Sequence, residues 1–95
     1  MINHEVNLDF LLLLLKEELT PRWYEFGSVV GVPKDILDGY LGYPSDQCLI
    51  ELLDYWLRHH PGQLTWREVA QALREIKLYQ LAEKALQISK TGFCD

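Results

Sequence analysis

The chain has 95 residues, of which 48% are hydrophobic, and a formal net charge of −5. This length and apolar content are sufficient for one domain with its own core and exclude an intrinsically disordered chain. The negative charge disfavours general attraction to phosphate, so nonspecific binding of nucleic acid is not expected.

The two cysteines, Cys48 and Cys94, are too few for a disulfide framework and are predicted to be free thiols in a reducing compartment. The apolar run at residues 10–15 is far shorter than the roughly 20 residues that span a bilayer. Glu5 and Asp9 precede this run, where a signal peptide would be basic. We therefore expect a cytoplasmic protein without membrane insertion, which includes the cytosolic part of a larger receptor, adaptor or scaffold.

The first predicted helix follows Asn7, a favourable N-cap. It carries leucine on nearly every side, and a helix that is apolar all round is usually buried on several faces. Leu13 and Leu14 lie off the main stripe, so a second interpretation is a helix that docks another part of the parent protein. The main stripe consists of Leu8, Leu11, Leu12, Leu15 and Leu19.

A second helix is predicted after Thr20, with Thr20 as its cap and Pro21 at its first position, where a missing N–H is tolerated. Gly31 is expected to end this helix. Gly27 lowers helix propensity by about 1 kcal/mol but lets a neighbouring helix approach closely. The inward face carries Trp23, Phe26 and Val30.

A short third helix is predicted from Val32-Pro33 onward, with Ile36 and Leu37 as its apolar residues. Ser45 is expected to cap a fourth helix, which the His59-His60-Pro61-Gly62 segment closes. Cys48 lies on its wide apolar face and is predicted to be a buried, inert thiol. The other residues of that face are Leu49, Leu52, Leu53, Trp56 and Leu57.

Thr65 and Glu68 form a capping-box pattern at the start of a fifth helix, and Leu64 and Val69 are placed as its hydrophobic staple. A break near Lys77-Leu78 leads to a sixth helix. No segment shows the period-two alternation of a strand, and the short connections favour antiparallel packing. The predicted fold is therefore all-α, a six-helix antiparallel bundle at residues 7–88, with an N-terminal extension at 1–6 and a loose C-terminal tail at 89–95.

The order and spacing of these segments resemble the death domain, the six-helix Greek-key bundle of apoptotic and innate-immune signalling. The resemblance covers about residues 8–88 and is carried mainly by Trp56 in the fourth helix, followed by the Thr65-Trp66 opening of the fifth. That opening favours death domains over the related effector and caspase-recruitment domains. Phe26-Gly27 stands where family members usually have leucine-alanine, so the packing of the second helix is expected to differ.

The resemblance implies an adaptor-like module that binds other death domains, its own copies included, and that is not an enzyme. It implies three asymmetric contacts, each of which joins two different patches. Contacts of this heterologous kind generate rings or open helices rather than closed dimers. No cofactor, metal ion or small-molecule substrate is expected.

The resemblance also suggests residues for each contact. In the first, helices one and four meet helices two and three, which gives Glu17, Glu51 and Asp54 against Arg22 and Lys34. In the second, the end of helix four meets the turn before helix six, which gives Arg58, His59, His60 and Gln63 against Lys77, Tyr79 and Gln80. In the third, helix three meets neighbouring loops, which gives Lys34, Asp35, Asp38 and Tyr40 against Thr20, Arg22, Tyr43 and Asp46. Tyr40 and Tyr43 either bind a partner, as interface tyrosines often do, or cover the core beneath helix three.

The residue types that serve metal binding or catalysis occur without the required spacing. The possible metal ligands are His4, His59, His60, Cys48 and Cys94, and they include neither a Cys-x-x-Cys pair nor a His pair at i,i+4. No glycine loop of the phosphate-binding kind is found. Neither a metal site nor an active site is therefore predicted.

Two other functions stay open at this stage. Helices four and five could form a DNA-binding helix-turn-helix, although the second of them mixes Arg67, Arg74 and Lys77 with Glu68 and Glu75. The leucine-rich first helix could instead dock a neighbouring domain of the same protein and hold it inactive. Strong exposure of Leu13 and Leu14 would favour such a docking surface.

Overall fold

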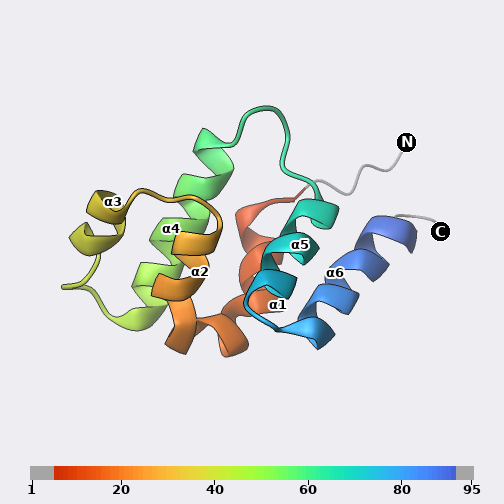
Figure 1. Ribbon diagram of the computed structural model, residues 1–95, viewed down its shortest axis with the longest axis horizontal. Coiled ribbons are helices and arrows are strands. Elements are labelled where there is room, and N and C mark those ends of the chain that lie inside the picture. Colours follow the sequence, from red (N-terminus) through yellow and green to blue (C-terminus); the bar gives the residue numbers. More distant parts are fainter. Residues whose placement is uncertain (1–5, 92–95) are drawn as a thin grey trace.

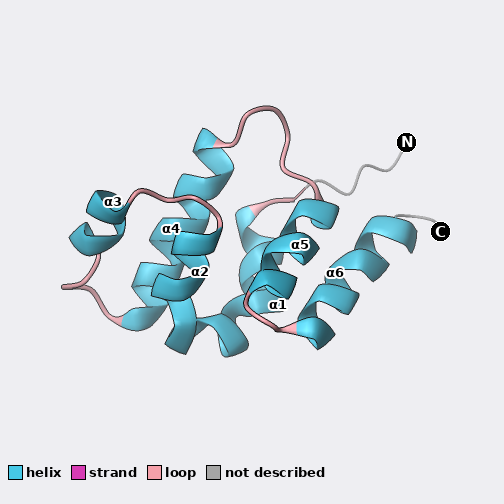
Figure 2. Cartoon of the chain, viewed as in Figure 1, coloured by secondary structure: helices cyan, strands magenta, loops and turns pink. Residues whose placement is uncertain are grey.

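The computed structural model describes residues 6–91, and its secondary structure is entirely helical within that range (Figures 1 and 2). The all-α prediction is confirmed. Residues 1–5, most of the predicted N-terminal extension, and residues 92–95 lie outside the described part. The elements are α1 (Leu8–Leu19), the 3-10 turn η1 (Thr20–Arg22), α2 (Trp23–Val29), α3 (Lys34–Gly39), α4 (Ser45–His59), α5 (Trp66–Glu75) and α6 (Tyr79–Thr91).

The helices are arranged along an axis of 42 Å, with α3 at one end and α6 at the other (Figure 1). Helices α1 and α2 pack against α4, and α5 packs against α6. The α4–α5 loop lies at one long edge of the molecule, and the α5–α6 turn lies at the opposite edge (Figure 1). The surface around the α4–α5 loop is therefore separated from the surface around the α5–α6 turn by the length of α5.

The core is built from the apolar stripes that the sequence predicts. Leu11, Leu15 and Leu19 of α1 are fully buried. Phe26 meets Trp56 edge to face, with ring centroids 5.5 Å apart and an interplanar angle of 79°. Such aromatic pairs contribute about 0.5–1.5 kcal/mol beyond their buried area. Phe26 is fully buried as well, and the other large side chains in this class are Leu37, Cys48, Leu49, Leu52, Leu53, Val69 and Leu73.

Two predicted helix caps are confirmed. The Asn7 side chain accepts a hydrogen bond from the Phe10 N–H at 2.9 Å. Thr65 Oγ1 accepts one from the Glu68 N–H at 3.2 Å. The reciprocal half of the capping box is replaced, because the Glu68 carboxylate lies 2.7 Å from Nε2 of His60. Each cap satisfies one of the backbone donors left free at a helix start.

The predicted caps of α2 and α4 are wrong. Thr20 has helical backbone angles, φ −54° and ψ −47°, whereas an N-cap needs extended ones. Its hydroxyl donates to the Lys16 carbonyl instead, and α2 begins only at Trp23. Ser45 is already helical, because Pro44 before it has the φ of −58° and ψ of 151° that suit a cap. The Pro44 carbonyl accepts the first helical hydrogen bond, from Cys48 at 3.0 Å.

Helix α2 ends in a Schellman motif, as the glycine after it predicts. Gly31 has a φ of +92°, the left-handed region where a side chain would be strained. Its N–H donates to Ser28 at 3.2 Å, and the Val32 N–H donates to Gly27 at 3.0 Å. These two bonds satisfy carbonyls that the helix end would otherwise leave free.

Helix α5 ends with the same hydrogen-bond pattern, but a lysine occupies the left-handed position. Lys77 has a φ of +65°. Its N–H donates to Arg74 at 3.0 Å, and the Leu78 N–H donates to Leu73 at 2.9 Å. The sequence predicts a break here, but the left-handed lysine was not foreseen.

The last turn of α6 corrects the predicted C-terminal tail. Ser89 was expected to begin a loose segment, whereas the helix continues to Thr91. Ile88 packs against the core, so apolar burial extends almost to the end of the helix. Residues 89–91 therefore belong to α6.

Candidate functional site

The predicted interface residues of α3 form a small hydrogen-bonded cluster with α2. Asp38 Oδ1 accepts a hydrogen bond from the Tyr24 hydroxyl at 2.7 Å, and Asp38 Oδ2 lies 2.9 Å from Lys34 Nζ. The hydrogen bond from Lys34 lowers the pKa of Asp38, and that from Tyr24 adds to the effect. The same bonds raise the pKa of both Lys34 and Tyr24. Lys34 and Asp38 thus lie together, as the third predicted contact requires, and Asp35 is exposed beside them.

The two tyrosines after α3 differ in their exposure. Tyr40 is half-buried against the core, and burial raises its pKa. Tyr43 is 49% exposed and stacks on Tyr40 with ring centroids 6.2 Å apart. Cys48 holds this loop to α4, because its thiol donates to the Tyr40 carbonyl at 3.0 Å. Leu41, between the tyrosines, is 61% exposed. The sequence did not reveal this exposed leucine, because a loop has no regular spacing from which a buried and an exposed side can be told apart.

Most charges proposed for the first contact are held within the chain. Gln47 Nε2 donates to Glu51 at 2.8 Å, and Asp54 pairs with Arg58 at 3.0 Å. Arg22 donates through Nη2 to the Ile76 carbonyl at 2.9 Å, which fastens η1 to the end of α5. Its Nε also lies 3.0 Å from Glu25.

Glu17 of the first contact differs from these charges, because it is exposed on α1. Asp46 of the third contact accepts a hydrogen bond from the N–H of Gln47, next to it in the chain, at 3.0 Å. Thr20 is half-buried and bound to α1, as described above. Of the residues predicted for the loop side of the third contact, Tyr43 and Asp46 are exposed, and Thr20 and Arg22 are half-buried.

The residues of the second contact lie on two opposite edges of the molecule. At the end of α4, the His59 ring stacks on Tyr55 with centroids 4.0 Å apart, and His60 faces Glu68. Gln63 is exposed in the loop that follows, and Arg58 is exposed in the last turn of α4. At the α5–α6 turn, Lys77, Tyr79 and Gln80 are all exposed, Tyr79 by 57%.

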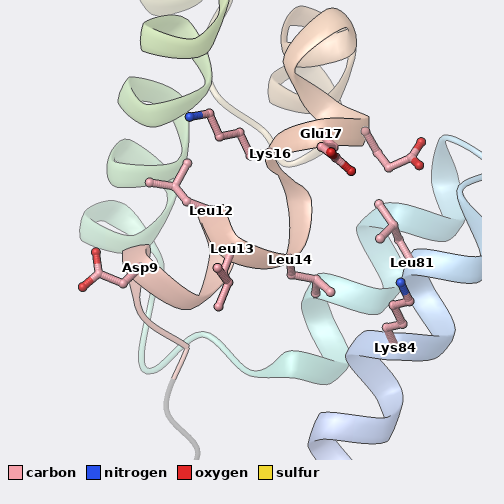
Figure 3. A pocket seen from close by; sticks show the side chains of 9 residues that line it. Asp9, Leu12, Leu13, Leu14, Lys16, Glu17, Leu81 and Lys84 are labelled. Atoms are coloured by element: carbon pink, nitrogen blue, oxygen red, sulfur yellow. The ribbon is translucent and has the colours of Figure 1, made fainter.

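A third exposed surface, which we call the α1 face, was foreseen only in part. Leu13 is 84% exposed and Phe10 is 52% exposed, whereas Leu14 is half-buried and packs against the core. Leu13 and Leu14 also line a surface groove of about 490 Å³ between α1 and α6 (Figure 3). Phe10 lies three residues before Leu13 and could have been assigned to the same helix face from spacing alone.

Of the possible metal ligands named from the sequence, Cys48, His59 and His60 lie within the described residues. Cys48 is buried, and desolvation raises its pKa. Within residues 6–91, no group of three or more His, Cys, Asp and Glu side chains is arranged to hold a metal. His4 and Cys94 lie outside the described residues.

Two further surface properties bear on the alternatives. The exposed residues of α5 mix both signs of charge, with Arg67 and Arg74 beside Glu68 and Glu75. Among the described helices, none combines the length and the hydropathy needed to cross a bilayer.

Comparisons of the chain with protein-family models, with curated proteins and with solved structures found no significant match. The surfaces described above are therefore the basis for a functional proposal.

Proposed function

We propose that this chain is a protein-interaction module of the death-domain kind, a six-helix antiparallel bundle that assembles signalling complexes through homotypic contacts. Its partners are other death domains, further copies of itself included, and it has no catalytic role. The order of the helical elements and the tryptophans buried at Trp56 and Trp66 support this fold assignment.

One observation carries the functional proposal. The two predicted halves of the second contact, at the end of α4 and at the α5–α6 turn, are exposed on opposite edges of the molecule (Figure 1). Because the two halves lie on opposite edges, the end of α4 in one copy can contact the α5–α6 turn only in another copy. Each copy therefore contacts two neighbours, one through each half. Repetition of such a contact gives rings or open helices instead of a closed twofold dimer.

Two variants, each altered in one half of the contact, provide the test. Arg58→Glu changes the α4 edge, and Tyr79→Ser changes the α5–α6 edge; both side chains are exposed. By light scattering, the unaltered protein is expected to form assemblies alone or with a second purified death domain. Each variant alone is expected to lose them, whereas the two variants mixed form a one-to-one complex through their remaining intact halves.

A matched control keeps this test specific. Gln71→Ala alters an exposed position of α5 that belongs to none of the three predicted contacts, and it is expected to assemble normally. Monomers at every concentration and with every partner domain, or a pair of variants that fail to complement each other, would contradict the proposal.

A second candidate function has one specific observation in its favour. Leu13 is 84% exposed, and such exposure favours a docking surface on α1. In an intramolecular docking or autoinhibitory domain, another segment of the parent protein would cover this residue. The test compares hydrogen exchange in this chain alone and in the chain joined to such a segment of the parent protein. Slower exchange confined to α1 in the longer protein would support this function.

A further inference from the structure

The α1 face combines a protrusion with a depression beside it. Leu13 and Phe10 project from α1, and the groove next to them is floored by Leu14 of α1 and Leu81 of α6 (Figure 3). Leu81 is only 7% exposed, so the floor belongs to the packed core. A smaller hollow of about 270 Å³ shares Glu18, Leu81 and Lys84 with this groove and extends it along the start of α6.

The two sides of the groove carry opposite charges. Glu17 and Glu18 line it from α1, and Lys84 lines it from α6, with Lys77 at the α5–α6 turn along the extension. Lys16 of α1 points away from α6 (Figure 3). On α6, Glu83 lies about 100° around the helix from Lys84, since successive residues of an α-helix are separated by that angle. The groove thus has Glu17 and Glu18 on its α1 side, here called the α1 row, and Lys84, with Lys77 just before α6, on the other side, here called the α6 row; Lys16 also lines the groove, on the far side of α1.

We propose that this α1 face binds a second copy of the chain in a twofold dimer. A twofold axis that runs along the groove brings the α1 row of each copy against the α6 row of the other. Glu17 and Glu18 of one copy then face Lys84 of the second copy, and the same contact occurs twice. Leu13 of each copy enters the groove of the other and covers Leu14 and Leu81.

The protrusion favours a second copy over a separate helical segment. A helix laid into the groove would cover its floor but leave Leu13 exposed on the outer side of α1. A second copy covers both, because the surface supplies its own protrusion and its own depression. The apolar part of the dimer surface, Leu13, Leu14 and Leu81, uses no residue of the second contact proposed above, although Lys77 lies along both surfaces.

The size of the surface predicts a weak dimer. The 12-residue helix α1 is about 18 Å long, and interfaces limited to one helix and its neighbour fall below roughly 1,200 Å² of buried area. Interfaces of that size are transient. Sedimentation equilibrium from roughly 10 µM to 1 mM protein covers the range in which such a dimer forms.

The first test uses the full chain with Arg58→Glu, so that the heterologous contact is blocked and the dimer is measured alone. We expect a monomer–dimer equilibrium that stops at two copies. Adding Leu13→Glu is expected to weaken the dimer about tenfold or more, because a charge would be buried without a partner. Leu41→Glu, at a similarly exposed leucine in the α3–α4 loop, is the matched control and leaves the dimer unchanged.

The second test exchanges the charged rows. A variant with Glu17→Lys and Glu18→Lys has two basic rows, and a variant with Lys84→Glu has two acidic ones. Each alone is expected to be monomeric, and the mixture is expected to dimerise, because both symmetric contacts then join opposite charges. Circular dichroism confirms that each variant is folded.

Three results would overturn the dimer. These are monomers at all concentrations in the Arg58→Glu background, equal loss from Leu13→Glu and Leu41→Glu, or a mixture of charge variants that stays monomeric. None of them bears on the complementation of Arg58→Glu by Tyr79→Ser, so the two proposals fail separately.

Discussion

Gly27 of α2 and Leu37 of α3 are so close that a Cβ atom at position 27 would lie 2.5 Å from Cδ2 of Leu37. Both residues are buried, and Leu37 is 1% exposed. The glycine in the middle of a helix is therefore a packing requirement, and the close approach predicted from the sequence is confirmed.

Gly27→Ala is expected to destabilise the fold by about 1 kcal/mol. Overpacking of a filled core costs about 1–3 kcal/mol, and the better helix propensity of alanine returns up to about 1 kcal/mol. Urea denaturation measures the net change. Ser28→Ala, an exposed substitution in the same helix, is the control and is expected to change stability by less than about 0.5 kcal/mol. An increase in stability for Gly27→Ala would mean that Leu37 moves aside freely.

Lys77→Gly is expected to stabilise the fold by about 1 kcal/mol. Left-handed backbone angles destabilise the fold by about 1–2 kcal/mol for a residue with a Cβ atom, and glycine removes this strain. Part of the gain is cancelled, because glycine is more flexible in the unfolded chain and loses more entropy on folding. Lys77→Ala separates this backbone effect from loss of the side chain and should bring no such gain. Thermal denaturation is the measurement.

The reverse substitution, at the left-handed glycine that ends α2, tests the same backbone strain. At Gly31 an added Cβ meets no atom within 4 Å, so Gly31→Ala reports backbone strain alone. We expect a loss of about 1 kcal/mol. If Lys77→Gly destabilised the protein while Gly31→Ala did not, the left-handed assignments at both helix ends would be wrong.

The carboxyl of Asp38 is expected to titrate below its usual pKa of 3.8. Because its pKa in the folded protein is lower than in the unfolded chain, the charged carboxylate stabilises the fold fully above pH 3.8. That contribution is lost as the pH falls through the lowered folded-state pKa. An NMR titration of the Asp38 side-chain carbon measures the midpoint.

Lys34→Met is expected to raise that midpoint toward 3.8, because it removes the larger cause of the shift. Lys16→Met, on α1, is the control for the loss of a positive charge elsewhere and should leave the midpoint in place. A midpoint at or above 3.8 in the unaltered protein would show that the cluster of Tyr24, Lys34 and Asp38 does not form in solution.

The fold was largely predictable because apolar spacing and capping chemistry are local. Of the predicted α1 stripe, Leu11, Leu15 and Leu19 are fully buried and Leu8 and Leu12 are half-buried, and Thr65 marks the start of α5 as predicted. The errors at Thr20 and Ser45 arose because several neighbouring residues can serve as the boundary of a helix. The backbone conformation, which the sequence does not display, selects one of them.

The candidate surfaces were less predictable because exposure depends on tertiary packing. Arg22 donates to the carbonyl of Ile76, which is 54 positions further along the chain, so its engagement could not be foreseen from its neighbours. Leu13 and Leu14 look alike in the sequence. They differ in the structure, where Leu13 is 84% exposed and Leu14 is half-buried and packs against the core.

Helix α3 has only six residues, which is too short to hold its own shape in water. It stays helical because Leu37 fills the notch left by Gly27 and Asp38 is tethered to Tyr24. Both attachments lead to α2, while α3 itself lies at one tip of the molecule, far from α5 and α6 (Figure 1). The helical form of α3 therefore depends on its contacts with α2, and the loop that follows it is held to α4 by Cys48.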